Sequence, residues 1–417
     1  MTSNIREVSL GEVCEIKQGR YLAPNQMEEV PTQDCQVPVI GGNGVLGYTN
    51  ETTFPFAVPL VTCRGSKCGL MQWAEPPTWI SNNAMALYFK ENLGDNFFLH
   101  QYLLNSNFDD VITGSAQPQI TVTNLSLKRI LLPDLQTQTN ISRFMKCLDE
   151  KITVNEHLSK TLEDIAQTIF KSWFIDFDPV KAKMAGEKPV GMDEETAALF
   201  PDSFVESELG LIPNGWEGGS LGDIIDLQGG YAFKSASWTN SGVPVIKIGS
   251  VKPGFVDLNQ VSYIDESLAN EISDDYRLPA GSLVIGLTGY VGEVGLVRTN
   301  YPVPLINQRV AKFKAKTDEW KIPFIYCFTR NQAFKKQVEE LATGTAQQNV
   351  SNSQILSIPL TVPNKEVQEC FERIFEPFFS QIINLADENE ALKGIRDSLL
   401  PRLISGELQI PEEMLAS

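Results

Sequence analysis

Two short loops carry amide side chains at matching places in the sequence. Residues 114–117 read Gly-Ser-Ala-Gln, and residues 344–347 read Gly-Thr-Ala-Gln. Glutamine and asparagine amides can form paired hydrogen bonds with N6 and N7 of adenine. The alternative is that the loops cap the strand and helix that follow them, which their repetition favours. The candidate base-reading residues are Gln117 and Gln119 in the first loop and Gln347, Gln348 and Asn349 in the second.

Basic side chains are candidates for contact with phosphate. Lys312, Lys314 and Lys316 alternate along the chain, so a strand there would present all three ammonium groups on one face. A solvated strand face explains the same pattern, and the sequence leaves both interpretations open. Loops whose sequences differ between the two halves of the chain are better places for contacts that read particular bases. The candidates in such loops are Arg64, Lys67 and Arg309.

Motifs for catalysis are absent from the sequence. It contains no phosphate-binding lysine loop, no HExxH zinc motif and no Asn/Asp-Pro-Pro-Tyr/Phe of the amino-methyltransferases. Gly42, Gly44 and Gly47 satisfy the GxGxxG spacing, but turn-forming residues follow, which predicts a tight turn rather than a dinucleotide site. With only two histidines, the seven scattered cysteines lack partners for a metal site. These features favour a binding protein over an enzyme.

The composition is that of a globular protein with reduced thiols, which predicts a cytoplasmic location. No apolar run reaches the length of a membrane span, so no membrane association is expected. The net charge of −18 predicts weak non-specific DNA binding by the isolated chain. Acidic residues are sparsest, relative to basic ones, in residues 216–362, so a local basic face remains possible there.

The elements that position these loops occur twice. The two Gly-x-Ala-Gln loops lie 230 residues apart, and the same offset relates Ile120 to Val350 and Leu162 to Leu392 without a gap. Upstream, Ser-Leu-Gly-Glu-Val (9–13) matches Ser-Leu-Gly-Asp-Ile (220–224). Such long-period self-similarity predicts two copies of one unit. Each copy is a variable globular part followed by a well-matched tail, so the chain has two similar but unequal binding faces.

The tails have the spacing of long amphipathic helices. A heptad with position a at Ile141 predicts a coiled-coil seam in residues 141–173, and the second tail repeats it; Lys151 is the one misfit, next to Ile152. A helix packed on its own domain is the alternative. Asn155 fits either a register-fixing polar position or a solvated edge. The predicted seam residues are Leu148, Asn155, Leu158, Leu162, Ile165 and Ile169 in the first tail, and Phe378, Leu385, Leu392, Ile395 and Leu399 in the second.

These observations predict an α+β protein with a pseudo-twofold internal repeat. Two similar mixed globular domains would each be followed by a long helix, and the two helices would pack on each other as a coiled coil. The predicted segments are a first globular domain (1–140), a central long helix with its linker (141–215), a second globular domain (216–363) and a C-terminal long helix (364–417).

The sequence resembles the specificity subunits of type I restriction–modification systems over essentially its whole length. The most specific run is residues 170–181, Phe-Lys-Ser-Trp-Phe-Ile-Asp-Phe-Asp-Pro-Val-Lys. Further matching segments are Ser-Leu-Gly at 9–11 and 220–222, Gly-Gly-Asn-Gly at 41–44 followed by Gly-Tyr at 47–48, the Gly-x-Ala-Gln loops, residues 191–193, 197–202 and 207–210, and Leu-Leu-Pro-Arg-Leu-Ile-Ser-Gly-Glu-Leu at 399–408.

The resemblance implies two target recognition domains that each read one half of an asymmetric bipartite site in double-stranded DNA. It implies that two long antiparallel helices, which form a coiled coil, hold these domains apart as a ruler for the unspecified spacer, and that the protein is cytoplasmic in a bacterium or archaeon. It also implies docking of two methyltransferase (modification) subunits and of ATP-driven restriction subunits. S-adenosylmethionine, ATP and Mg would then belong to those partners, and this chain would bind no cofactor and catalyse no reaction. The alternatives are a non-catalytic coiled-coil scaffold or regulatory relative in another defence system, and a stand-alone DNA methyltransferase or nuclease.

Overall fold

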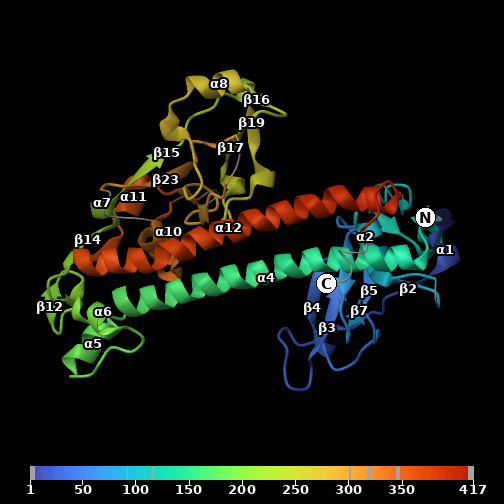
Figure 1. Cartoon of the computed structure of the whole chain (residues 1–417), viewed down its shortest axis with the longest axis horizontal. Coiled ribbons are helices and arrows are strands. Elements are labelled where there is room, and N and C mark those ends of the chain that lie inside the picture. Colours follow the sequence, from blue (N-terminus) through green and yellow to red (C-terminus); the bar gives the residue numbers. More distant parts are fainter. Residues whose placement is uncertain are drawn as a thin grey trace. The chain divides into compact units, whose positions relative to one another are not determined.

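The computed structural model describes residues 5–91, 93–114, 117–299, 302–317, 322–343 and 348–411 (Figure 1). The chain forms two compact units. Unit 1 comprises Met1–Ile152 and Ala391–Ser417, and unit 2 comprises Thr153–Glu390. Among the described residues, no helix has the length and apolar character of a membrane span.

Unit 1 is built on a four-stranded antiparallel sheet that is covered on both faces. Its strand order is β2 (Cys14–Gln18), β8 (Ala84–Phe89), β5 (Val58–Thr62) and β6 (Met71–Ala74). Helix α2 (Asn96–Leu104) packs on one face, and the sheet of β4 (Gly44–Thr49), β3 (Val37–Gly41) and β7 (Trp79–Ile80) packs on the other. Because both faces are covered, the apolar strand β5 is buried along its whole length.

The remaining elements of unit 1 flank this core. Strand β1 pairs antiparallel with β11, and β9 with β10. In chain order these elements are β1 (Arg6–Ser9), α1 (Leu10–Val13), η1 (Pro24–Gln26), β9 (Ile112–Thr113), β10 (Gln119–Ile120), α3 (Val122–Leu127) and β11 (Arg129–Leu132).

Unit 2 repeats the two-sheet plan. Its larger sheet has the order β15 (Ile225–Gly229), β23 (Val310–Ala315), β20 (Leu283–Gly286), β21 (Val294–Leu296) and β18 (Gly254–Phe255). Its second sheet has the order β16 (Trp238–Thr239), β19 (Ser262–Ile264), β17 (Val243–Ile246) and β22 (Leu305–Ile306). The other elements are α5 (Asp178–Met184), α6 (Glu194–Ala198), β12 (Phe204–Ser207), β13 (Gly210–Pro213), β14 (Glu217–Ser220), α7 (Leu221–Ile224), η2 (Ser235–Ser237), η3 (Ile248–Ser250), η4 (Leu258–Gln260), α8 (Glu266–Glu271), η5 (Asp274–Tyr276), α9 (Ile322–Arg330), α10 (Gln332–Leu341), α11 (Asn352–Leu356) and β24 (Pro359–Val362).

Several backbone hydrogen bonds outside the helices and strands occur at equivalent positions within each of the two units. The bond from Leu10 N to Lys128 O, at 2.9 Å, recurs from Leu221 N to Ile358 O at 2.8 Å. The equivalent pairs elsewhere are Ser81 N to Ile40 O (2.9 Å) with Asn307 N to Ile246 O (3.0 Å), and Gly19 N to Ala84 O (3.0 Å) with Gly230 N to Val310 O (3.1 Å). The predicted α+β class with an internal repeat is therefore confirmed at the level of single backbone groups.

Two 40-residue helices, α4 (Leu135–Phe174) and α12 (Lys365–Ile404), contribute to both units. In unit 2, Asn155 Nδ2 donates to Asn389 Oδ1 at 2.9 Å, and the rings of Phe170 and Phe371 lie 5.8 Å apart. Residue numbers thus rise along α4 as they fall along α12, so the helices pack on each other in antiparallel directions. In unit 1, Arg396 on α12 donates to Asp149 on α4 at 2.9 Å.

The seam of this helix pair consists of two rows of side chains. The first row starts at Ile141 and repeats every seven residues, as predicted, whereas the second row differs from the predicted one. Leu158, Ile165 and Ile395 are 42%, 40% and 44% exposed, so they lie beside the seam rather than in it. The second row was predicted three residues after each first-row residue, but the buried side chains lie four residues after it. Its buried members are Met145, Ile152, Ala166 and Trp173 on α4 and Phe375, Ile382, Asn389 and Leu403 on α12. Lys151, the misfit in the predicted row, marked this shift, because a seam position disfavours a charged side chain.

The other predicted seam residues lie in or next to the buried surface. Asn155 is 1% exposed and Leu385 is 4% exposed. Those that are partly buried are Leu148, Leu162, Ile169, Phe378, Leu392 and Leu399.

Candidate nucleic-acid interface

In unit 1, three neighbouring strands meet their loops at one edge of the larger sheet. Strand β5 ends at Thr62 opposite Ala84, the first residue of β8, and β2 ends at Gln18 opposite Met85. The segments 19–23, 63–70 and 81–83 therefore come together there. We call this edge the loop end of unit 1.

The first Gly-x-Ala-Gln loop is attached to this loop end by its backbone. Arg64 and Gln119 form an antiparallel bridge, Gly65 N donates to Pro118 O at 3.2 Å, and Ile120 N donates to Cys63 O at 3.0 Å. The structure thus brings together four residues that the sequence singled out separately: Arg64, Lys67, Gln117 and Gln119. The side chains of Arg64, Lys67 and Gln117 are exposed, as base or phosphate contact requires.

Three more amide residues lie at the same loop end and were missed by sequence reasoning. Gln18 Nε2 donates to Asn82 O at 2.6 Å, and Cys63 N donates to Asn83 O at 2.9 Å. The side chain of Asn83 is exposed. The internal repeat relates Asn83 to a residue that was already a candidate. The hydrogen bond from Cys63 N to Asn83 O in unit 1 recurs in unit 2 from Leu287 N to Arg309 O at 3.0 Å. Asn83 therefore occupies the position of the candidate Arg309.

Unit 2 has an equivalent loop end with different side chains. Gly289 N donates to Gln348 O at 2.9 Å, Val350 N donates to Leu287 O at 3.0 Å, and Thr288 bridges Asn349. Arg309, Gln348 and Asn349 are exposed here. Gln347 lies outside the described residues. Since Thr288 stands where unit 1 has Arg64, the same backbone presents a different set of groups in each unit.

Lys312 and Lys314 of β23 lie on one face, as alternation predicts, because the neighbouring Ala311 and Phe313 are buried, and Lys316 directly follows the strand. Their ammonium groups already have partners within unit 2. Lys312 Nζ donates to Arg277 O at 3.2 Å, and Lys314 Nζ lies 4.0 Å from an oxygen of Asp275. Burial lowers the pKa of Lys312, as does the like charge of Lys314, while Asp275 opposes the shift.

Lys316 has a structural role that the repeat explains. Its ammonium group donates to Gly222 O, at the short helix α7, and Lys90 Nζ donates to Gly11 O at 2.8 Å and Glu12 O at 3.0 Å, at the equivalent helix α1. A lysine beside the carbonyl groups of a helix end is favourable in itself. This pairing gives Lys316 a structural role that needs no ligand, and its contact with phosphate stays a prediction.

The remaining sequence motifs are structural. Gly42–Gly47 forms the turn and second strand of the β3–β4 hairpin, with Gly44 at φ +103°, so the GxGxxG spacing marks the tight turn that was predicted. Among the described residues, no three His, Cys, Asp or Glu side chains are grouped as metal ligands. The cysteines there are free thiols, and burial raises the pKa of Cys14 to about 12.

The sequence and structure were compared with those of known proteins. Residues 2–164 and 213–393 match the type I restriction modification DNA specificity domain. The chain is 30% identical over 335 residues to the HindI specificity subunit of Haemophilus influenzae, covering 70% of this chain and 71% of that protein. It is 25% identical over 368 residues to the MjaIX specificity subunit of Methanocaldococcus jannaschii, covering 86% and 79%. The structure of a type I S subunit from M. genitalium superposes with a TM-score of 0.60 at 17% identity, covering 96% of each chain, which shows the shared fold.

The family match covers both copies of the repeat and both loop ends. Specificity subunits are non-catalytic, which agrees with the expectation from the missing motifs. On these grounds the chain belongs to the specificity subunits of type I restriction–modification systems.

Proposed function

We propose that this chain selects an asymmetric bipartite site in double-stranded DNA, with the loop end of each unit reading one half-site. The observation that carries the proposal is the contrast between the loop ends. Their backbone hydrogen bonds match one for one, whereas their side chains differ: Arg64 against Thr288, Asn83 against Arg309, and Gln119 against Asn349. A common backbone that carries different polar side chains in each unit is suited to bind two different short DNA sequences, because contacts with the bases carry the sequence information.

The proposal includes two copies of one methyltransferase subunit as partners, and repeated apolar strips beside the helix seam support it. In unit 2, Ile165 on α4 and Ile374 on α12 are 40% and 37% exposed. In unit 1, Ile395 on α12 is 44% exposed and Leu148 on α4 is partly exposed. The offset of 230 relates the strips residue by residue: Leu162, Ile165, Ile169, Ile374 and Phe378 in unit 2 match Leu392, Ile395, Leu399, Phe144 and Leu148 in unit 1.

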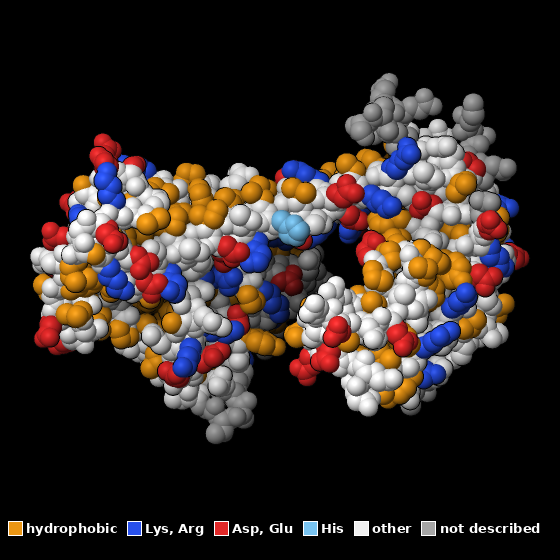
Figure 2. Space-filling model, turned by 90° about the horizontal axis from the view of Figure 1, so that it is seen from below, with side chains coloured by type: hydrophobic (Ala, Val, Ile, Leu, Met, Phe, Trp, Pro, Cys, Tyr) orange, Lys and Arg blue, Asp and Glu red, His pale blue; other side chains and the backbone are white. Residues whose placement is uncertain are grey.

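Two equivalent strips suit two identical partners. Figure 2 shows hydrophobic side chains reaching the surface next to charged ones, as is common where helices bind further helices. We further propose that these partners, together with ATP-driven restriction subunits, hold S-adenosylmethionine, ATP and Mg. The partners would then supply much of the phosphate contact that a chain of net charge −18 lacks.

The antiparallel helices would set the length of the spacer between the half-sites. Inserting one heptad after Leu158 and a matched one after Glu388 keeps the seam in register and lengthens each helix by about 10 Å. This corresponds to roughly three base pairs. Activity of the doubly extended chain on the original spacer would contradict this part of the proposal.

Mapping N6-methyladenine across the genome, in cells with and without this chain, tests the function. We expect a methylated motif with two unequal halves that disappears when the chain is removed. Arg64→Ala should relax or change one half only, and Arg309→Ala the other, since each base contact contributes about 1–3 kcal/mol of discrimination. Methylation that is unchanged without the chain, or an Arg64→Ala variant that alters both halves, would refute the proposal.

A further inference from the structure

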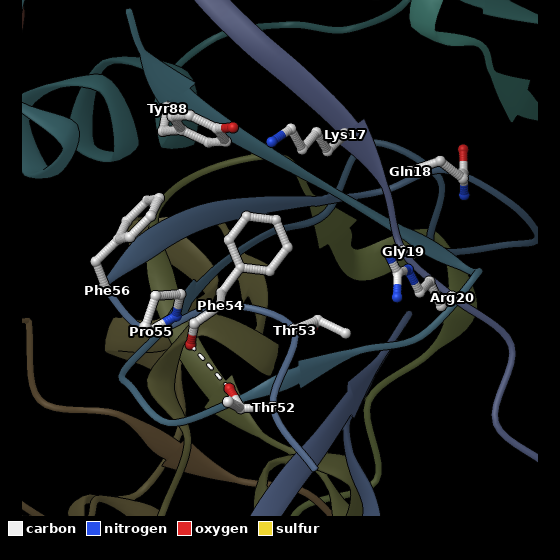
Figure 3. Close-up of a pocket in the computed structure, with 10 residues that line it drawn as sticks. All are labelled: Lys17, Gln18, Gly19, Arg20, Thr52, Thr53, Phe54, Pro55, Phe56 and Tyr88. Carbon is white, nitrogen blue, oxygen red and sulfur yellow. Dashed lines mark hydrogen bonds between the residues drawn. The ribbon is translucent and has the colours of Figure 1, made fainter. Parts of the chain in front are cut away.

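Unit 1 contains a pocket beside its loop end that the half-site proposal does not use. The pocket has a volume of about 560 Å³, which is within the usual range of small-ligand sites (roughly 300–1,000 Å³). It lies between the edge strand β2, strand β8 and the segment that follows β4 (Figure 3). The pocket adjoins the loop end, because Arg20 N donates to Ile80 O at 2.8 Å, just before residues 81–83.

One side of the pocket is aromatic. The rings of Phe56 and Tyr88 meet edge to face with centroids 5.2 Å apart, and Phe54 lies 6.0 Å from Phe56 and 6.1 Å from Tyr88. Phe54 is buried, but Phe56 is 42% exposed and Tyr88 is partly exposed. Two rings at a steep angle leave a corner where a planar ring can stack on one and meet the edge of the other. An exposed phenylalanine at such a corner is typical of a stacking platform for bases.

The other side of the pocket is cationic. Lys17 extends from β2 toward Tyr88, and its ammonium group lies 5.2 Å from the centroid of that ring (Figure 3). A hydrogen bond with Tyr88 raises the pKa of Lys17, so the side chain remains charged at neutral pH. Arg20 is the second cation. Among the described residues that line the pocket there is no Asp or Glu, although Glu15 lies near Lys17 on the same strand.

The second copy of the repeat does not keep these groups. In unit 2, Gln228 and Lys314 stand at the positions of Lys17 and Tyr88, as the strand pairing shows. Gln228 Nε2 donates to Asp275 O at 2.9 Å, and Lys314 Nζ lies 4.0 Å from the Asp275 carboxylate. The segment around Asp275 therefore engages these side chains, whereas in unit 1 their counterparts line a pocket.

We propose that this pocket of unit 1 binds one nucleotide unit, with the base against Phe56 and Tyr88 and the phosphate at Lys17 and Arg20. The nucleotide has two possible sources: a residue of a DNA strand held at the adjoining loop end, or a free nucleotide. Only the first source rests on the proposed function. In both cases the ligand is an aromatic ring joined to an anion, which matches the two sides of the pocket.

Titration of the full-length chain with AMP, with inorganic phosphate and with duplex DNA that contains the mapped site tests the proposal. We expect AMP to bind more tightly than phosphate. Phe56→Leu keeps an apolar side chain but removes the ring, and should weaken AMP binding by about 5- to 150-fold, the range for one stacked base. Lys17→Ala should weaken both AMP and phosphate. Arg6→Ala removes a cation from β1, outside the pocket, and should change neither.

The pattern of losses identifies the source. If the nucleotide belongs to DNA, Phe56→Leu and Lys17→Ala weaken duplex binding as well as AMP binding. If it is free, they weaken AMP binding alone and leave the methylated motif unchanged. The proposal is overturned if both variants keep the wild-type melting temperature and bind AMP and duplex as the unmodified chain does. A methylation map that is the same with and without the chain would instead refute the half-site proposal, while AMP binding would still support the pocket.

Discussion

The corrected helix seam makes a sharp prediction for two isoleucines on α12 in unit 2. Ile382 is 2% exposed, whereas Ile374 is 37% exposed, although both belong to the same helix. Changing either one to alanine alters helix propensity equally, so the difference between the variants reports burial alone. Ile382→Ala should lower the free energy of unfolding by about 2–5 kcal/mol, through lost apolar contact and the cavity left behind. Ile374→Ala should lower it by at most about 1 kcal/mol.

Urea unfolding of the full-length chain, followed by circular dichroism, measures both effects in the transition that reports on unit 2. The slope of that transition must stay constant for the midpoints to be compared as stabilities. Binding to the methyltransferase subunit should give the reverse order. Ile374→Ala should weaken it, and Ile382→Ala should leave it unchanged at temperatures where the variant is folded. Equal losses of stability, or a larger loss for Ile374→Ala, would refute the seam with spacing four.

The remaining predictions concern polar groups and thiols. Asn155→Ala should lower the free energy of unfolding by about 1–3 kcal/mol, because it removes the hydrogen bond that the buried Asn389 accepts from Asn155. Replacing both Asn155 and Asn389 by leucine should restore the lost stability, as measured by urea unfolding. A further loss in the double variant would show that the pair does more than contribute its hydrogen bond. Lys316→Ala should lower the free energy of unfolding by about 1 kcal/mol and leave the DNA affinity of the assembled complex unchanged. A clear loss of DNA affinity would show that Lys316 contacts phosphate. Cys14, whose pKa burial raises to about 12, should stay almost entirely protonated at pH 8, so mass spectrometry should find a thiol reagent on the exposed Cys147 well before it reaches Cys14.

Sequence reasoning recovered those features that repeat at a constant offset. The paired Gly-x-Ala-Gln loops and the two long helices were visible because no gap interrupts the offset of 230 between them. It failed on the second seam row because rows three and four residues after Ile141 both contain apolar side chains, and only packing decides between them. The clearest evidence in the sequence is that the row with spacing three contains Lys151, whereas the row with spacing four contains Ile152.

The loop ends and the pocket were beyond sequence reasoning for a different reason. Arg64 and Gln119 form an isolated β-bridge although they lie 55 positions apart in the chain, and the sequence contains no local signal for that contact. The same holds for the groups around Tyr88 on β8. Lys17 meets it because β2 pairs with one side of β8, and Phe56, which precedes β5, meets it because β5 pairs with the other side. The structural partner of Lys316 was not visible in the sequence, because its counterpart Lys90 lies at an offset of 226, outside the ungapped part of the repeat.

The division of the chain into units has a consequence for the order in which they form during synthesis. Unit 2 is one continuous stretch, Thr153–Glu390, and can close its core as soon as that stretch leaves the ribosome. Unit 1 begins first but is completed late, because Leu400, Leu403 and Ile404 pack in its core with Leu10 and Ile141. At typical synthesis rates of about 5–20 residues per second, the first 152 residues wait on the order of tens of seconds for those side chains. During that interval the part of the unit 1 core that these three side chains fill is incomplete, so the nascent first domain exposes apolar surface for longer than unit 2 and has the greater need for a chaperone.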